Sequence, residues 1–475
     1  MKHKIFEITI MEKIGLHILK LAFLLISINV FSQNSSSVTN GTITKKIISQ
    51  YFKNKRTIKI LLPEKYDANK NYPVIYTLDG FELFPIASSY VNFLTKYDVI
   101  PNCIIVGIYH NNRNYETMPN YGSDIRIPVT EFLEGSGNLK SHLLEEVVPM
   151  IEKQYSVSGF NVIIGHSNTA TFVNEIISKN ENNFNGFIAI TPDLLKKQTD
   201  YLEKHLSEKQ LKQTYYFVSS GLKDDKYRLE SGIMLDTIFH NSKNTNFKGL
   251  HKIYSAGHLD LVPKSLNDAL MFIFSDYKNY DDFNDKVLNS KFSISNYIDQ
   301  KSILNNKIYG INYKLNEEDF YYLLNLVLEK KDRKLFEQIF EVGEKNKFFN
   351  KDDKYASKAQ YYEEIKLYDE ALKNWKLQIE KGFYKNTFYF ERPFILLTKK
   401  LKRQKEAIVF LEKAIKKYPE GKLIFNYLIA QTSLKYSLKK NKGIKAIDYC
   451  INRFKENNKF SLKDALEIKS NINKN

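Results

Sequence analysis

Cysteine is scarce in this 475-residue sequence, and its two examples, Cys103 and Cys450, lie far apart. A chain without a close cysteine pair relies on a packed core rather than on a disulfide framework. Cys103 falls within an apolar run, where we expect a buried and unreactive thiol.

The sequence also lacks the motifs that bind nucleic acid. It has no zinc-finger spacing, no glycine-rich phosphate loop and no aromatic RNA-binding motif. The net charge is nevertheless +17, mostly because residues 281–475 hold 40 Lys and Arg against 27 Asp and Glu. This excess is spread over helical segments, which is typical of a solvated helical surface or of attraction to an anionic envelope. We therefore expect no nucleic-acid partner.

The apolar run near the N-terminus is too short to span a bilayer. Residues 21–31 are uncharged, follow several lysines and precede Ser32 and Gln33, which is typical of a secretory signal peptide. Met11 is an alternative start, and a buried helix of the mature fold is the other interpretation. We expect residues 1–32 to be the signal, cleaved near Ser32/Gln33, and residues 33–50 to be a leader. The mature protein would be periplasmic or secreted, with no transmembrane span.

The length favours two domains. In residues 51–278, near-continuous apolar runs alternate with helical patterns, which predicts an α/β domain with a mostly parallel sheet covered on both faces. The expected strands are residues 58–62, 73–78, 103–108, 161–164, 186–190, 215–219 and 250–254.

Residues 279–475 show the helical period throughout. Small residues recur in successive helical pairs, because Ala407 lies 36 residues after Ala371 and Ala446 lies 39 residues after Ala407. Leu335 lies 36 residues before Ala371. Periods of this size resemble those of tetratricopeptide repeats, so we expect an all-α domain of such repeats. A plain helical bundle is the alternative.

One stretch carries the pattern of a catalytic nucleophile. Gly165-His166-Ser167-Asn168-Thr169 lies between an expected strand and an amphipathic helix, as in a nucleophile elbow. The expected oxyanion donors are the amides of Asn168 and of Gly80, the latter in a loop that follows an earlier strand.

The base and acid should follow the serine in the chain, each after a strand. His258 fits the base, whereas His240 and His251 are less well placed. Asp224 is the favoured acid and Asp193 the runner-up. Asp225 is adjacent to Asp224, and Asp260 fits a surface or helix-capping role better.

Three further side chains are expected at the same strand-end edge. Phe81 and Asp193 are assigned to substrate contact. Arg113 follows another strand and would bind a polar or carboxylate group of the substrate, or form a structural salt bridge.

Together these motifs resemble the esterase D group of α/β-hydrolases, the broad family that includes ferric enterobactin esterases. The resemblance covers about residues 50–275 and rests on motifs in the family order: Leu61–Tyr66, Tyr72–Gly80, Val106–Ile108, Leu143–Pro149, Gly165–Ser167, Thr191–Leu194 and Gly257–His258. It implies hydrolysis of a carboxylic ester by Ser167, His258 and Asp224, without a metal or other cofactor. The substrate would be a small ester, a siderophore or an acylated glycan.

The elbow departs from the family pattern in one respect. Two glycines normally follow it, whereas this chain has Thr169 and Ala170. The rival hypothesis is therefore an impaired hydrolase scaffold whose repeats bind a protein partner.

Overall fold

A computed structural model describes residues 37–39, 41–117, 129–178, 183–194, 196–207 and 212–474. The expected signal peptide and its cleavage site near Ser32/Gln33 lie outside the described residues. The chain divides into two compact units. Unit 1 comprises residues up to Asp282 together with Gln300–Lys314, and unit 2 comprises Phe283–Asp299 together with Leu315–Asn475.

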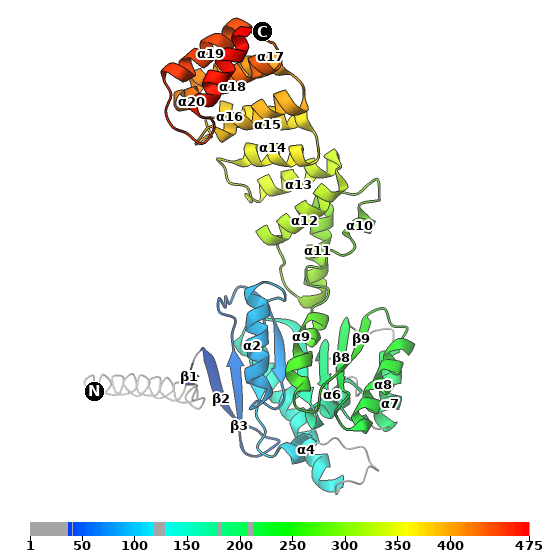
Figure 1. Ribbon diagram of the computed structural model, residues 1–475. Coiled ribbons are helices and arrows are strands. Elements are labelled where there is room, and N and C mark those ends of the chain that lie inside the picture. Colours follow the sequence, from blue (N-terminus) through cyan, green and yellow to red (C-terminus); the bar gives the residue numbers. More distant parts are fainter. Residues whose placement is uncertain are drawn as a thin grey trace, which may run out of the picture. The chain divides into compact units, whose positions relative to one another are not determined.

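Unit 1 (Figure 1) is built on a sheet that has nine strands within the described residues. The strand order is β1-β2-β3-β5-β4-β6-β7-β8-β9. Pairing is antiparallel from β1 to β5 and parallel from β5 to β9. The strands are β1 (Ser37–Thr39), β2 (Thr42–Ile48), β3 (Lys55–Leu61), β4 (Tyr72–Thr77), β5 (Ile104–Ile108), β6 (Val157–His166), β7 (Gly186–Ile190), β8 (Thr214–Gly221) and β9 (Phe247–Tyr254).

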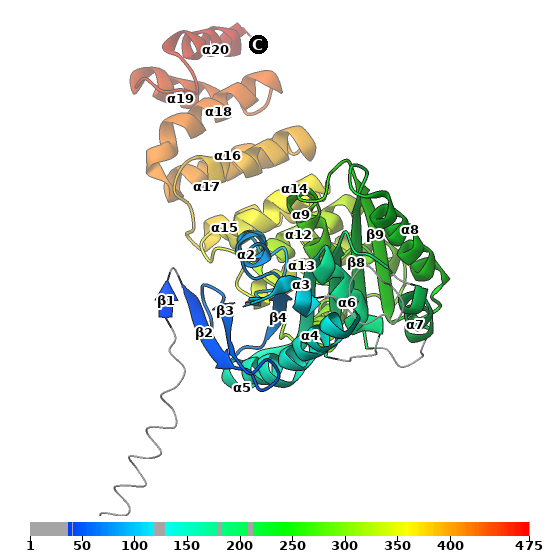
Figure 2. The same cartoon turned by 90° about the horizontal axis from the view of Figure 1, so that it is seen from below.

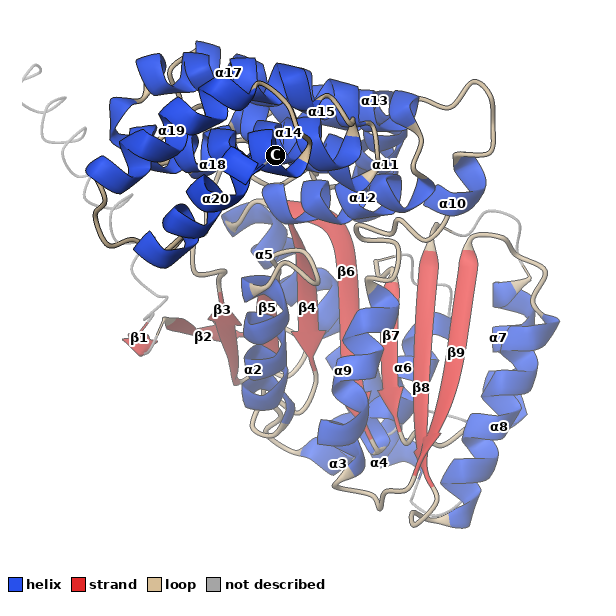
Figure 3. Cartoon of the chain, turned by 45° about the horizontal axis from the view of Figure 1, so that its top comes forward, coloured by secondary structure: helices blue, strands red, loops and turns tan. Residues whose placement is uncertain are grey.

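Helices cover both faces of this sheet (Figure 3). One face packs against α2 (Leu83–Lys96) and α9 (Leu261–Ile273). The other packs against α4 (Val129–Ser141), η1 (His142–Val147), α5 (Val148–Gln154), α6 (Asn168–Ser178), α7 (Lys196–Leu206) and α8 (Lys226–Asn241). Every residue of β4, β5, β7 and β8 is buried, as expected of parallel strands between two helical layers. The predicted α/β fold with a mostly parallel sheet is confirmed.

Two segments at the ends of unit 1 correct the sequence-based outline. Residues 33–50 were expected to be a leader, but β2 pairs with β3 along its whole length, and Ile43 and Ile47 pack on the core. The lysines between these isoleucines obscured the strand. At the other end, Tyr309 lies beyond the predicted boundary at residue 278, yet it is fully buried in unit 1 against Phe160 and Phe274.

Unit 2 is formed by helices (Figures 1 and 2). They are α10 (Phe283–Lys286), α11 (Ile294–Tyr309, which continues into unit 1), α12 (Glu317–Lys330), α13 (Arg333–Lys345), α14 (Lys354–Glu364), α15 (Tyr368–Glu380), α16 (Phe388–Ile395) with η2 (Leu396–Lys400), α17 (Gln404–Lys417), η3 (Pro419–Gly421), α18 (Lys422–Lys435), α19 (Lys440–Asn452) and α20 (Leu462–Lys474). No helix among the described residues has both the length and the apolar composition that a membrane span requires.

The second helices of the successive pairs are α13, α15, α17 and α19. They begin at Arg333, Tyr368, Gln404 and Lys440, so each starts 35 or 36 residues after the one before. The unit is therefore a row of similar helical hairpins, as the sequence predicted, because each hairpin can bury its apolar face only against its neighbours.

The register of the last hairpin differs from the prediction. Ala371 and Ala407 are fully buried, but the equivalent position in α19 is Gly443, which lies 36 residues after Ala407. A Cβ on Gly443 would lie 2.6 Å from the Cβ of Ser433 in α18. The two helices cross closely here, and Ala446, the predicted position, lies almost one turn further along.

Candidate active site

The candidate nucleophile, Ser167, lies in a tight turn between β6 and α6. Its φ is +61°, in the left-handed region that a residue with a side chain rarely adopts. Its N–H donates to the carbonyl of Ile190 in β7 at 3.0 Å, which ties the turn to the neighbouring strand. Gly165 is required here, since a Cβ on it would lie 2.3 Å from the carbonyl oxygen of Thr169. Strand, strained serine and helix thus form the geometry of a nucleophile elbow.

His258 and Asp224 lie together at the ends of the last two strands. The His258 Nδ1 is 3.0 Å from both carboxylate oxygens of Asp224. The carboxylate also accepts hydrogen bonds from the Thr191 hydroxyl at 2.5 Å and from the Asp225 N–H at 2.7 Å. Because Nδ1 faces a carboxylate, it carries the hydrogen, and Nε2 is left to accept a proton.

Opposing effects act on the Asp224 carboxyl. Burial raises its pKa, but the hydrogen bonds from Thr191, Asp225 and His258 outweigh burial and leave the pKa below its ordinary value. The group is therefore a carboxylate at neutral pH and can hold the His258 Nδ1–H in place.

The other candidate acids are engaged elsewhere. The Asp193 Oδ1 accepts from the Leu194 N–H at 2.9 Å, and Ser231 lies within reach at 3.4 Å. Asp260 accepts from the Gly257 N–H at 2.6 Å and pairs with Lys264. Among the candidates, Asp224 is the carboxylate that the structure brings to His258. The Asp193 carboxylate is hydrogen-bonded within its own loop and does not take the predicted role of contacting a substrate.

The two alternative histidines are also placed away from this pair. His251 contacts the Ser220 hydroxyl at 2.9 Å, and His240 lies exposed on α8.

His166 connects the serine turn to the His258 loop, and the sequence analysis assigned it no role. Its Nε2 is 2.9 Å from the His258 carbonyl oxygen, and the two rings lie 4.8 Å apart. Burial lowers the pKa of His166 to about 4, so the ring is neutral at neutral pH and Nε2 carries its hydrogen. Within the described residues, no hydrogen bond joins the Ser167 hydroxyl to His258, and catalytic hydrogen bonds are often long before substrate binds.

The predicted oxyanion donors are corrected at one position. The Gly80 N–H donates to the Ile108 carbonyl at 2.8 Å, so it is not available to a ligand. Glycine is needed there for space, since a Cβ would lie 2.5 Å from the Tyr109 ring. Across the described residues, the amides of Phe81 and Asn168 have no hydrogen-bond partner. Phe81 therefore replaces Gly80 as the candidate donor, and its exposed side chain lies against the Tyr109 ring.

The Arg113 guanidinium forms its hydrogen bonds within the protein. Its Nε and Nη2 lie 2.6 Å and 3.0 Å from the two oxygens of Asp79, and Nη2 also donates to the His166 carbonyl at 3.0 Å. Of the two predicted roles, the structure assigns Arg113 the structural salt bridge.

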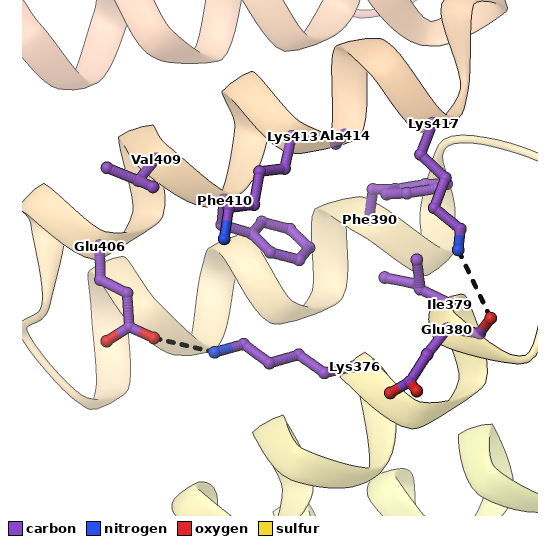
Figure 4. Close-up of a pocket in the computed structure, with 10 residues that line it drawn as sticks. All are labelled: Lys376, Ile379, Glu380, Phe390, Glu406, Val409, Phe410, Lys413, Ala414 and Lys417. Atoms are coloured by element: carbon purple, nitrogen blue, oxygen red, sulfur yellow. Dashed lines mark hydrogen bonds and ion pairs between the residues drawn. The ribbon is translucent and has the colours of Figure 1, made fainter.

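A separate groove of about 490 Å³ lies in unit 2, between α15, α16 and α17 (Figure 4). Apolar side chains such as Phe390 and Phe410 line it, together with lysines and glutamates of which Lys376 and Glu406 form an ion pair at 2.9 Å. None of its lining residues belongs to unit 1.

Comparisons with known proteins agree with this fold. Residues 49–251 match the family model named Esterase. The fold is similar to that of an IroE-like serine hydrolase from Shewanella oneidensis, with 20% identity, a TM-score of 0.51, and coverage of 65% of this chain and 98% of that one. It is also similar to an uncharacterised protein from Capnocytophaga ochracea, with 18% identity, a TM-score of 0.55, and coverage of 75% and 99%. No curated protein matches the chain.

Proposed function

We propose that this chain, whose residues 49–251 match the family model named Esterase, is a serine ester hydrolase with Ser167 as its nucleophile. The observation that carries the proposal is the juxtaposition of three strand ends. A strained serine follows β6, Asp224 follows β8, and His258 follows β9 with its Nδ1 on that aspartate. This is the chain order of an α/β-hydrolase triad.

In the proposed reaction the Ser167 hydroxyl attacks the ester carbonyl carbon while its proton passes to the His258 Nε2. The tetrahedral intermediate collapses, the bond to the leaving alkoxy group breaks, and His258 protonates that group to release an alcohol. Water then attacks the acyl-enzyme, giving up a proton to His258 and releasing a carboxylic acid. Asp224 stays ionised throughout and orients the imidazole.

The negative oxygen of the intermediate needs nearby donors. The amides of Asn168 and Phe81 are the proposed pair, because each lacks a partner in the described structure. Asn168 is the first residue of α6, after the serine turn, and Phe81 lies in the loop after β4. The N-terminus of α6 adds a favourable partial charge.

Exposed apolar side chains near the site support an ester with an apolar acyl or alcohol group. Phe81, Leu222 and Leu259 are 71%, 61% and 75% exposed, and each lies within two residues of a proposed site residue. A larger apolar group on the substrate would cover these side chains and gain about 25 cal/mol of binding free energy for each Å² of apolar surface removed from water. A siderophore, an acylated glycan and a small ester remain the proposed substrate classes.

The test is hydrolysis of p-nitrophenyl acetate and butyrate by the mature protein beside its Ser167→Ala and His258→Ala variants. Turnover that is lost in both variants, with circular dichroism unchanged, would support the proposal, and a higher kcat/KM for butyrate would support the apolar preference. Wild-type turnover no higher than that of Ser167→Ala would count against an esterase of small activated esters.

We also propose that the chain is exported and that its signal peptide is cleaved near Ser32/Gln33. Expression of the full chain in a Gram-negative bacterium, followed by intact-mass measurement of the periplasmic fraction, would show a mature protein beginning near Gln33. Full-length protein confined to the cytoplasm would contradict export. A protein partner bound by the helical hairpins also stays a prediction.

A further inference from the structure

We propose that Thr169 and Asp79 form a clamp that sets the distance between the two oxyanion donors, the amides of Asn168 and Phe81. The inference rests on the proposed function. It gives a positioning role to a residue that departs from the resembled family pattern, in which glycine stands at that place.

The first half of the clamp lies in the elbow. The Thr169 side chain is fully buried, and its hydroxyl accepts from the His166 N–H at 2.7 Å. The same hydroxyl lies 2.7 Å from the Asp79 Oδ2 and 2.9 Å from the His166 carbonyl. Its single hydrogen goes to the carboxylate, since hydrogen bonds to ionised acceptors are the stronger ones. Thr169, two residues after Ser167, thereby connects both itself and His166, the residue before Ser167, to Asp79.

The second half lies in the loop after β4. Asp79 directly precedes Gly80 and Phe81, and its φ is +54°, a strained value for a residue with a side chain. Its N–H donates to the His110 Nε2 at 3.2 Å, and its carbonyl accepts from the N–H groups of Glu82 and Leu83.

Arg113 reinforces the connection from a third side. It binds both oxygens of Asp79 and also the His166 carbonyl, so the loop and the elbow share two links, one through Thr169 and one through Arg113. Side chains held by several charge-assisted hydrogen bonds move little, which suits a pair of donors that must not rearrange during reaction.

The spacing of the donors matters to the chemistry. They stabilise the oxyanion only when each donor lies about 2.7–3.1 Å from the position that the oxyanion will occupy. A misplacement of about 1 Å can cost on the order of 100-fold in rate. Loss of the Thr169 hydroxyl would leave Asp79 with one donor fewer and the His166 N–H without its acceptor, so the two loops could drift apart.

The experiment compares Thr169→Val, which keeps the shape but removes the hydroxyl, with Thr169→Ser, which keeps the hydroxyl. The readouts are kcat and KM for p-nitrophenyl butyrate, and inhibition by butylboronic acid, whose tetrahedral serine adduct needs the oxyanion donors. Titration with a fluorophosphonate counts the folded, reactive enzyme in each preparation. Thr214→Val is the matched control, because it removes another buried hydroxyl at the far end of β8, where it binds the Lys212 carbonyl.

We expect Thr169→Val to lower kcat at least tenfold with KM within about twofold, and to weaken boronate inhibition in the same proportion. Thr169→Ser and Thr214→Val should stay within about threefold of the wild type. If Thr169→Val does not fold, Thr169→Ala provides the same comparison.

An unchanged kcat in Thr169→Val, or an equal loss of kcat in Thr169→Ser, would overturn the proposed clamp without contradicting the proposed esterase function. Wild-type turnover that survives Ser167→Ala would overturn both proposals.

Discussion

At the residue scale, His166 makes the stability of unit 1 depend on pH. Burial lowers its pKa from about 6.5 to about 4, so the unfolded chain binds a proton more readily than the native protein does. Stability is then complete above about pH 6.5 and falls as the pH decreases towards 4. A pKa shift of this size changes the free energy of unfolding by on the order of 3 kcal/mol across this pH range.

Urea unfolding of the wild type and of His166→Gln, at pH 7 and pH 5, checks this. We expect the wild type to lose more stability between the two pH values than the variant, which has no titrating ring and keeps an N–H donor for the His258 carbonyl. An equal loss in both proteins would show that His166 does not titrate in this range. His142 and His251 also have pKa values lowered by burial, and they contribute equally to both proteins.

A second prediction at this scale separates the two candidate acids. Asp224→Asn should lower kcat by about 10³-fold or more, because the amide can no longer hold the imidazole in the required tautomer. Asp193→Asn is the matched control and should stay within a few-fold of the wild type, since that carboxylate binds its own loop. The measurement is kcat for p-nitrophenyl butyrate, and a larger loss in Asp193→Asn would reverse the assignment.

Chain order alone predicted most of the candidate site. Ser167, Asp224 and His258 follow strands in the sequence expected of an α/β-hydrolase, and parallel strands bring their carboxyl ends to one edge. Chain order could not reveal that the Gly80 amide is bonded to Ile108 or that Arg113 binds Asp79. Such facts depend on which loop approaches which, and residue types alone do not determine that.

At the element scale, helix α19 crosses α18 at Gly443, and this crossing leaves no room for a side chain. We expect Gly443→Leu to destabilise unit 2 by about 1–3 kcal/mol through overpacking. Lys445→Leu is the control: it lies two residues further on α19, is exposed, and should change stability by less than about 0.5 kcal/mol. Thermal unfolding followed by circular dichroism measures both, and equal melting temperatures would contradict the crossing geometry.

The same element shows why the repeat register was predicted only in part. Alanine marks the close crossing in α15 and α17, so a search for alanine reached Ala446 in the last hairpin. The physical requirement is a small residue, and glycine meets it three residues earlier. A period of 36 residues is visible in the sequence once glycine is allowed.

At the scale of the whole molecule, unit 1 needs residues from beyond its apparent end. Tyr309 is fully buried with its ring 4.9 Å from that of Phe160, and its hydroxyl accepts from the Asp276 N–H at 3.1 Å. We expect a fragment of residues 37–314 to unfold at a higher urea concentration than one of residues 37–278. The difference should be at least about 3 kcal/mol, the usual cost of removing a buried aromatic side chain. Equal midpoints would show that residues 300–314 are not part of the fold.

The two-domain organisation was visible in the sequence because the apolar period changes near residue 279. The return of a helical segment to the first unit was not visible, since Tyr309 lies in a helical pattern like those that follow it. Its contacts in the folded protein, among them those with Phe160 and Phe274, place it in unit 1.

The central proposal, that Ser167 is the nucleophile of an esterase, is tested most directly by mass spectrometry after treatment with a fluorophosphonate. We predict one adduct on the wild-type protein, which peptide mapping will locate on Ser167. The adduct should be absent from Ser167→Ala, and it should form much more slowly in His258→Ala. An unlabelled wild-type protein, or an adduct that persists in Ser167→Ala, would contradict the proposal.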